Sequence, residues 1–78
     1  MATDYTVGRF RAVNDSGQTL GIMINGGCIR NGGRDIFRVT EDIVDELEHG
    51  RDSFVGHFRD GTATSFQEGV VLFRLIPD

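Results

Sequence analysis

The side chains with the most chemical potential in this sequence are one thiol, Cys28, and two imidazoles, His49 and His57. A nucleophilic cysteine needs a neighbouring base or a lowered pKa. Nothing in the sequence places either histidine near Cys28, so we interpret this residue as a small apolar side chain. His49, Asp52 and His57 are close in sequence, but their spacing matches no pattern that fixes the ligand geometry of a metal. We therefore expect a protein that is not an enzyme, with no catalytic residue, metal or cofactor.

Two Asn-Gly-Gly segments, six residues apart, form a candidate loop for a small anion. Exposed backbone N–H groups beside arginines can hold an anion. The segment lacks the Gly-Lys-Ser/Thr ending of a phosphate-binding P-loop, however, and tight turns explain its glycines without a ligand. The residues of this candidate ligand site are Asn25, Gly26, Gly27, Arg30, Asn31, Gly32, Gly33 and Arg34.

The strongest feature outside the expected core is a group of five carboxylates between positions 41 and 48. On a helix they would occupy one side and repel one another at i,i+3 and i,i+4 spacings. Such a face either keeps a small protein soluble or docks a basic partner, with an association rate that depends on salt. The candidate partner-binding residues are Glu41, Asp42, Asp45, Glu46 and Glu48.

The hydrophobic pattern around these carboxylates predicts one short amphipathic helix. Thr40 suits the N-cap position. Ile43, Val44 and Leu47 cover an arc of about 100° at the helical period. Gly50 suits the position at which helices often end with a positive φ.

Alternating or continuous apolar runs predict strands on both sides of this helix. The expected strands cover residues 5–14, 20–24, 28–30, 35–39, 53–59, 62–67 and 70–76, the first with a bulge at Gly8-Arg9. Asp15-Ser16-Gly17 and Asp60-Gly61 predict turns between strands. Around 25–34, we expect either one turn and one bulge or a flexible loop that carries the short strand.

The hairpin closed by the second of these turns is expected to carry aromatic residues on both faces. A two-residue loop would pair Phe58 with Ala63 and His57 with a threonine at position 64. Regular alternation would then place Phe54 on the face of Phe58, with Phe66 and His57 on the other.

Together these elements predict an α+β protein: a mostly antiparallel bent sheet, or a small partly closed barrel, of about five to six strands with the helix packed on it. Seventy-eight residues indicate one domain, residues 1–78. A core of this size supplies on the order of 3–5 kcal/mol unless a crosslink or a partner adds to it. A homodimer is the expected support, because the apolar strand at residues 70–76 would otherwise be an unprotected edge.

The net charge of −4 is unevenly distributed, with +2 through Arg38 and −6 from Val39 onward. The acidic half argues against direct binding of nucleic acid, which needs clustered positive charge. No run approaches the roughly 20 apolar residues of a membrane span, and the first residues do not resemble a signal peptide. We therefore expect a soluble cytoplasmic protein with no membrane contact.

Two functions fit this reasoning. The preferred one is a non-enzymatic protein-interaction or regulatory module that docks a basic partner through the acidic helix face; a narrower version is an inhibitor of a nucleic-acid-binding protein. The alternative is a module that binds a small anionic ligand at the Asn-Gly-Gly loops and their flanking arginines.

Overall fold

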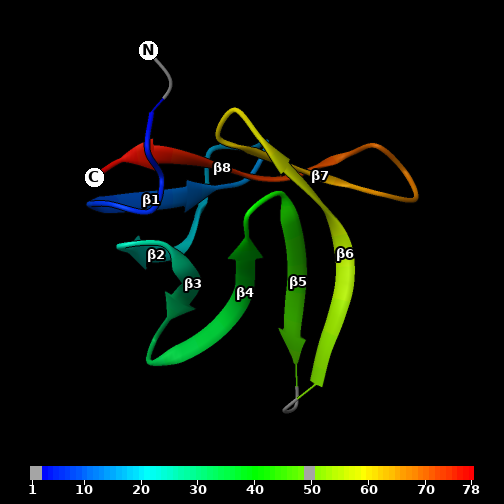
Figure 1. Cartoon of the computed structure of the whole chain (residues 1–78), viewed down its shortest axis with the longest axis horizontal. Helices are drawn as coiled ribbons and strands as arrows, with labels where there is room; N and C mark the ends of the chain where they lie inside the picture. Colours follow the sequence, from blue (N-terminus) through cyan, green and yellow to red (C-terminus); the bar gives the residue numbers. More distant parts are fainter. Residues whose placement is uncertain (1–2, 49–50) are drawn as a thin grey trace.

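The computed structural model describes residues 3–48 and 51–78, and the regular structure in them consists of strands (Figure 1). The strands are β1 (Arg9–Val13), β2 (Thr19–Ile24), β3 (Gly27–Asn31), β4 (Arg34–Thr40), β5 (Ile43–Glu48), β6 (Arg51–Arg59), β7 (Thr62–Ser65) and β8 (Val71–Pro77). Each strand pairs antiparallel with the next, and β8 pairs with β1, so the sheet is a closed barrel. The expected α+β class with five to six strands is therefore wrong: the described residues form an all-β barrel of eight strands.

The expected helix is instead a β-hairpin made by β4 and β5. Thr40 pairs with Ile43, so Glu41 and Asp42 form a two-residue turn. Glu41 adopts a φ of 55°, as the first central residue of a tight hairpin turn requires. The proposed helix end at Gly50 lies outside the described residues.

The burial pattern of β5 shows why a strand replaces the helix. Val44 is fully buried, whereas its neighbours Ile43 and Asp45 are only partly buried and face outward. β-branched residues such as Ile43 and Val44 favour a pleated strand. Pairing with β4 on one side and β6 on the other provides hydrogen-bond partners for the backbone N–H and C=O groups of β5 along its length. This non-local pairing overrides the helical spacing of the apolar residues.

The glycine-containing turns follow their sequence signals. Asp60-Gly61 closes the β6–β7 hairpin with φ values of 52° and 81°. Asn25-Gly26, with φ values of 53° and 78°, closes β2–β3, and Gly32-Gly33, with 61° and 84°, closes β3–β4. The segment at 25–34 is thus two tight turns around a five-residue strand, and the expected single turn with a bulge, or flexible loop, is wrong.

Four β-bulges bend the sheet so that it closes. In the pairs β1–β2, β3–β4, β5–β6 and β7–β8, one residue of the second strand is skipped in the register. A bulge bends its strand and increases the local twist. All four skipped residues are aliphatic, partly buried and packed against the core: Leu20, Ile36, Val55 and Leu72.

The residue after each bulge alternates between glycine and phenylalanine around the barrel: Gly21, Phe37, Gly56 and Phe73. A Cβ at Gly21 would lie 2.5 Å from the Arg30 carbonyl oxygen, and one at Gly56 would collide with the Thr64 carbonyl oxygen. The two glycines therefore allow β2–β3 and β6–β7 to approach closely. The phenylalanines, from β4 and β8, meet inside the barrel with ring centroids 5.1 Å apart.

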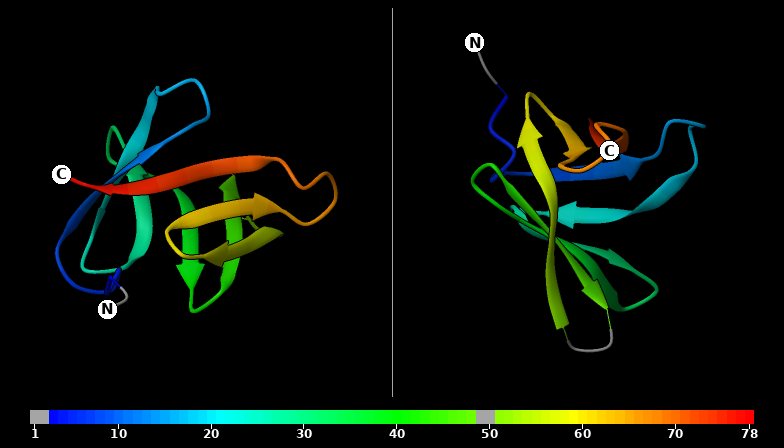
Figure 2. Two further views of the ribbon diagram at one scale, coloured as in Figure 1. Left: turned by 90° about the horizontal axis from the view of Figure 1, so that it is seen from above. Right: turned by 90° about the vertical axis from the view of Figure 1, so that its right-hand side faces the viewer.

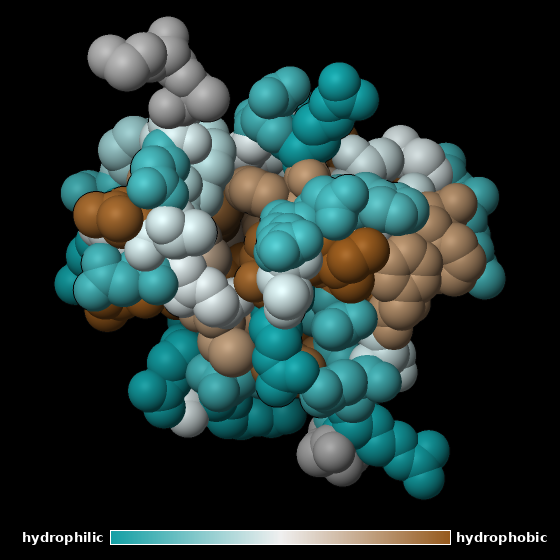
Figure 3. Space-filling view, in the orientation of Figure 1, coloured by the Kyte–Doolittle hydropathy of each residue, from teal (hydrophilic) through white to brown (hydrophobic). Residues whose placement is uncertain are grey.

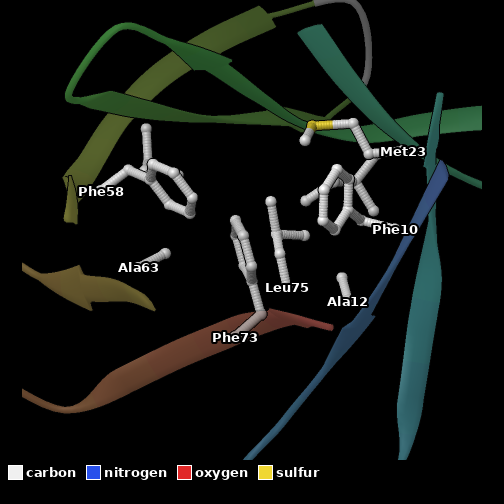
Figure 4. Packing of buried hydrophobic residues seen from close by; sticks show 9 residues of the cluster. Phe10, Ala12, Met23, Phe58, Ala63, Phe73 and Leu75 are labelled. Atoms are coloured by element: carbon white, nitrogen blue, oxygen red, sulfur yellow. The ribbon is translucent and has the colours of Figure 1, made fainter. Parts of the chain in front are cut away.

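The remaining interior is filled by side chains from all parts of the barrel (Figure 4). The buried core consists of Phe10, Ala12, Met23, Ile29, Val44, Phe58, Ala63, Phe73 and Leu75. Tyr5 covers one end, with its ring centroid 4.9 Å from Phe10 and 5.3 Å from Phe58. At the other end, the β5–β6 hairpin projects away from β1 and β8 (Figure 1, Figure 2).

Barrel closure also removes the reason for expecting a homodimer. The apolar strand β8 lies between β7 and β1 and presents no edge to a second copy. Arg74, the one charged residue of this strand, pairs with Asp15 of its own chain, with Nη1 and Oδ1 2.9 Å apart.

We predict that Gly56→Ala destabilises the protein strongly, because the added Cβ meets the backbone of β7 rather than a movable side chain. Overpacking of this kind costs about 1–3 kcal/mol, which lowers the urea midpoint by roughly 1–3 M for a protein of this size. Unfolding can be followed by the fluorescence of Tyr5, since the chain has one tyrosine and no tryptophan.

The matched control is Ser53→Ala, an exposed position on the same strand. Its free energy of unfolding should stay within about 0.5 kcal/mol of that of the native protein. Equal stability of the Gly56→Ala and Ser53→Ala variants would contradict the close approach of β6 and β7.

Candidate functional site

The five carboxylates of the sequence prediction do not share one face. Glu41 and Asp42 lie in the turn at one end of the β4–β5 hairpin, and Glu48 lies at the end of β5. Glu46 is opposite Phe37 in register and so lies on the other side of β5 from Asp45. A single acidic face made by all five residues is therefore wrong, because it depended on the helix.

Asp45 is the one of these carboxylates that stands beside exposed aromatic side chains. It is partly buried on the outer surface of β5, between Arg38 of β4 and Phe54 of β6 in register. Arg38 turns instead to Asp52, with Nη1 and Oδ2 2.5 Å apart. Hydrogen bonds to Asp52 and then to Cys28 raise the pKa of Arg38. Asp45 has no hydrogen bond or ion pair with any other residue that the structure describes.

A row of three rings adjoins Asp45 on the outer surface. The ring centroids of Phe54 and Phe66 are 4.8 Å apart, and that of His57 is 5.3 Å from Phe54. Phe54 is 41% exposed, Phe66 51% and the neighbouring Val70 49%. We call these four residues the aromatic face. Figure 3 shows apolar side chains gathered over β6 and the β7–β8 connection, bordered by hydrophilic ones.

The bulge at Val55 places Phe54 on this face. Regular alternation would put Phe54 inside with Phe58, which is 9% exposed, and that was the expectation from the sequence. Because Val55 is skipped in the register, Phe54 pairs with Asp45 and points outward with His57. The expected pairing of His57 with Thr64 is confirmed.

The β7–β8 connection, residues 66–70, holds the second phenylalanine beside the first. The Phe66 amide donates to the Val55 carbonyl at 3.0 Å. Further along, Ser65 donates to the Val70 carbonyl at 2.8 Å, and Gly69 donates to the Ser65 carbonyl at 3.0 Å. The aromatic face is therefore fixed by backbone hydrogen bonds from both sides of the loop.

The Asn-Gly-Gly candidate site is divided by the structure. Its two turns lie at opposite ends of β3 and do not converge. Arg30 donates to the Gly33 carbonyl at 3.1 Å and pairs with Asp35 at 3.2 Å. The Asn25 side chain accepts a hydrogen bond from the Gly8 amide at 2.9 Å. These residues make contacts within the protein, and the geometry favours turns over a ligand loop.

A small cavity of about 70 Å³ lies under Tyr5 at the covered end of the barrel. Its walls are mostly apolar and include Met23, Val39 and Phe58, with Glu41 at the margin.

The N-terminal turn that contains Tyr5 is held by Asp4, whose Oδ1 accepts hydrogen bonds from the Thr6 amide at 2.9 Å and from the Thr6 hydroxyl. These bonds lower the pKa of Asp4.

Other kinds of site find no support in the described part of the chain. Within residues 3–48 and 51–78, no three His, Cys, Asp or Glu side chains are grouped so as to hold a metal ion. Those same ranges contain no helix long and apolar enough to cross a membrane. Comparison with known proteins gives no match to a family model, a curated protein or a solved structure.

We predict that acid loosens the N-terminal turn over the barrel. The pKa of Asp4 in the folded protein lies below its ordinary value of 3.8, so its hydrogen bonds stabilise the turn at higher pH and are lost as the pH falls through the lowered pKa. Acrylamide quenching of Tyr5 fluorescence should therefore rise in the acid range, before the far-UV circular dichroism changes.

Asp4→Asn should show the higher quenching already at pH 7, because a neutral amide accepts more weakly from Thr6. Asp15→Asn serves as the control, since Asp15 pairs with Arg74 and does not contact Tyr5. Identical quenching in all three proteins at pH 7 would show that Asp4 does not hold the turn.

Proposed function

We propose that this protein is a non-enzymatic protein-interaction module that docks a basic partner on the aromatic face and Asp45. The observation that carries the proposal is the exposed pair of contacting rings, Phe54 and Phe66, beside a partly buried carboxylate that has no partner among the described residues. Exposed apolar patches with a polar border are typical of protein-binding surfaces.

This surface has the residue composition that is typical of the centre of a protein–protein interface. Aromatic residues supply much of the binding free energy when a partner covers them. The rings are held by the bulge and by the hydrogen bonds of the β7–β8 connection, so little conformational entropy is lost on binding. An unpaired carboxylate at the border favours a partner that brings a positive charge.

The surrounding charge supports a basic partner. A shallow hollow lined by Asp42, His57, Phe58 and Arg59 adjoins the aromatic face and brings one further carboxylate and one arginine. Of the carboxylates at 41–48, Asp45 and Asp42 are the two that border this face. Arg38, the nearest arginine in register, is neutralised by Asp52. The same charges repel phosphate groups, which makes direct binding of nucleic acid unfavourable.

We predict that the immobilised protein captures basic proteins from a lysate of its source cells at low salt and releases them at about 0.5 M salt, where screening extends only a few ångströms. Phe54→Ser/Phe66→Ser should reduce capture by about tenfold, since truncating a central aromatic contact costs on the order of 1–2 kcal/mol of binding free energy. Quantitative mass spectrometry of the eluates measures both effects.

The matched control is Val7→Ser/Ile24→Ser, which removes apolar side chains that are 64% and 59% exposed on another part of the surface. It should retain the same basic proteins as the native chain. Capture that is unaffected by the phenylalanine changes, or lost equally in the control, would contradict the assignment of this face.

A further inference from the structure

We infer that the aromatic face recognises an arginine side chain carried by an extended segment of the partner, with the guanidinium stacked on Phe54 and Phe66 and paired with Asp45. This inference rests on the proposed function and names the chemical group that the face accepts. The position of the carboxylate, the spacing of the rings and the closure of the sheet support it.

Asp45 and Phe54 are placed so that one cation can contact both. They are directly opposite in the β5–β6 register, and such cross-strand pairs have Cβ atoms about 4.5–5.5 Å apart. A cation over the face of an aromatic ring is attracted by its quadrupole. The adjacent carboxylate adds a charge-assisted hydrogen bond in the same position.

Arginine fits this arrangement better than lysine. Its guanidinium is planar, so it can stack on a ring while its edge donates two hydrogen bonds to one carboxylate. A lysine ammonium is a strongly hydrated point charge that cannot stack. Both rings are available to a ligand, because Phe54 and Phe66 are each about half exposed.

The dimensions of the face indicate an extended segment. The three centroids are joined by steps of 4.8 Å and 5.3 Å, so the row spans at most about 10 Å. An extended or polyproline II chain, rising about 3 Å per residue, covers this length with three residues. Binding by strand addition is excluded, because each of the eight described strands already has two neighbours.

Single-stranded nucleic acid is the competing ligand for a row of exposed rings, because bases stack on aromatic side chains. Its phosphates would lie beside Asp45, whose carboxylate has no partner among the described residues, and beside the carboxylate of Asp42 in the adjoining hollow. Phosphate contacts normally come from clustered positive charge, so the observations favour the arginine segment.

The test uses three fluorescein-labelled octapeptides: glycine alternating with arginine, with lysine or with glutamine. Fluorescence anisotropy at low salt should show the arginine peptide binding about three- to fivefold more tightly than the lysine peptide, from the stacking contribution. The glutamine peptide should bind more weakly than both. A labelled oligothymidylate of the same length should not bind.

Two variants separate stacking from charge. Phe54→Ala should remove the preference for arginine over lysine, whereas Asp45→Asn should weaken both cationic peptides. Val7→Ala, which changes an exposed side chain elsewhere, should leave all affinities unchanged. Far-UV circular dichroism and the urea midpoint confirm that each variant folds.

Equal affinities of the native protein for the arginine and lysine peptides would overturn the inference, as would oligothymidylate binding that Phe54→Ala abolishes. The proposed function is judged separately by the lysate capture. If capture of basic proteins depends on the phenylalanines but the peptides show no preference for arginine, the docking face stands and only the arginine assignment is wrong. If neither the phenylalanine dependence nor the arginine preference is found, the docking face is wrong as well.

Discussion

The fold depends on four β-bulges, one in each alternate strand pair of the barrel. Eight strands of four to nine residues must close within 78 residues, which requires sharper bending than regular strands provide. Each bulge supplies that bend and turns an aliphatic side chain toward the core. The alternation of glycine and phenylalanine after the bulges then sets the cross-section of the barrel. The backbones of neighbouring strands come close at Gly21 and Gly56, and the rings of Phe37 and Phe73 meet in the interior.

The bulge between β5 and β6 connects this core arrangement to the candidate binding surface. The phase shift at Val55 leaves Gly56 and Phe58 inside the barrel and projects Phe54 outward beside Asp45. The same Val55 carbonyl accepts the hydrogen bond that positions Phe66. The exposed aromatic face is therefore a consequence of how the barrel closes, and the stability of the core and the shape of the face depend on the same few residues.

The sequence predicted the local features that are encoded by backbone conformation. Asp-Gly needs positive φ and predicted the turn at Asp60-Gly61 correctly, whereas the two turns at 25–34 replace the expected single turn with a bulge or flexible loop. The pairing of Phe58 with Ala63 followed from the second turn. The final strand was recognised from its apolar run, although its partners on both sides were not.

The failures have a common physical cause, which is pairing between distant residues. The spacing of Ile43, Val44 and Leu47 fits a helical period better than strand alternation, and pairing with the neighbouring strands β4 and β6 overrides it. The phase of Phe54 depends on the bulge at Val55, and the one signal for it in the sequence is the adjacent Gly56, since a glycine within a strand pattern indicates a bulge or a close backbone approach. Among the candidate site residues, Asp45 is retained at the proposed docking face and Asp42 lies at its margin, while Phe54 and Phe66 were not selected as binding residues because exposure could not be read from their spacing.

The most direct test of this account measures the solvent exposure of the six phenylalanine rings. Solvent paramagnetic relaxation enhancement by a soluble gadolinium chelate, recorded on the aromatic protons by NMR, reports that exposure ring by ring. The account predicts strong enhancement for Phe54 and Phe66 and little for Phe58 and Phe73. Protection of Phe54 equal to that of Phe58 would show that β6 keeps regular alternation, and it would remove both the bulge at Val55 and the binding face that the bulge creates.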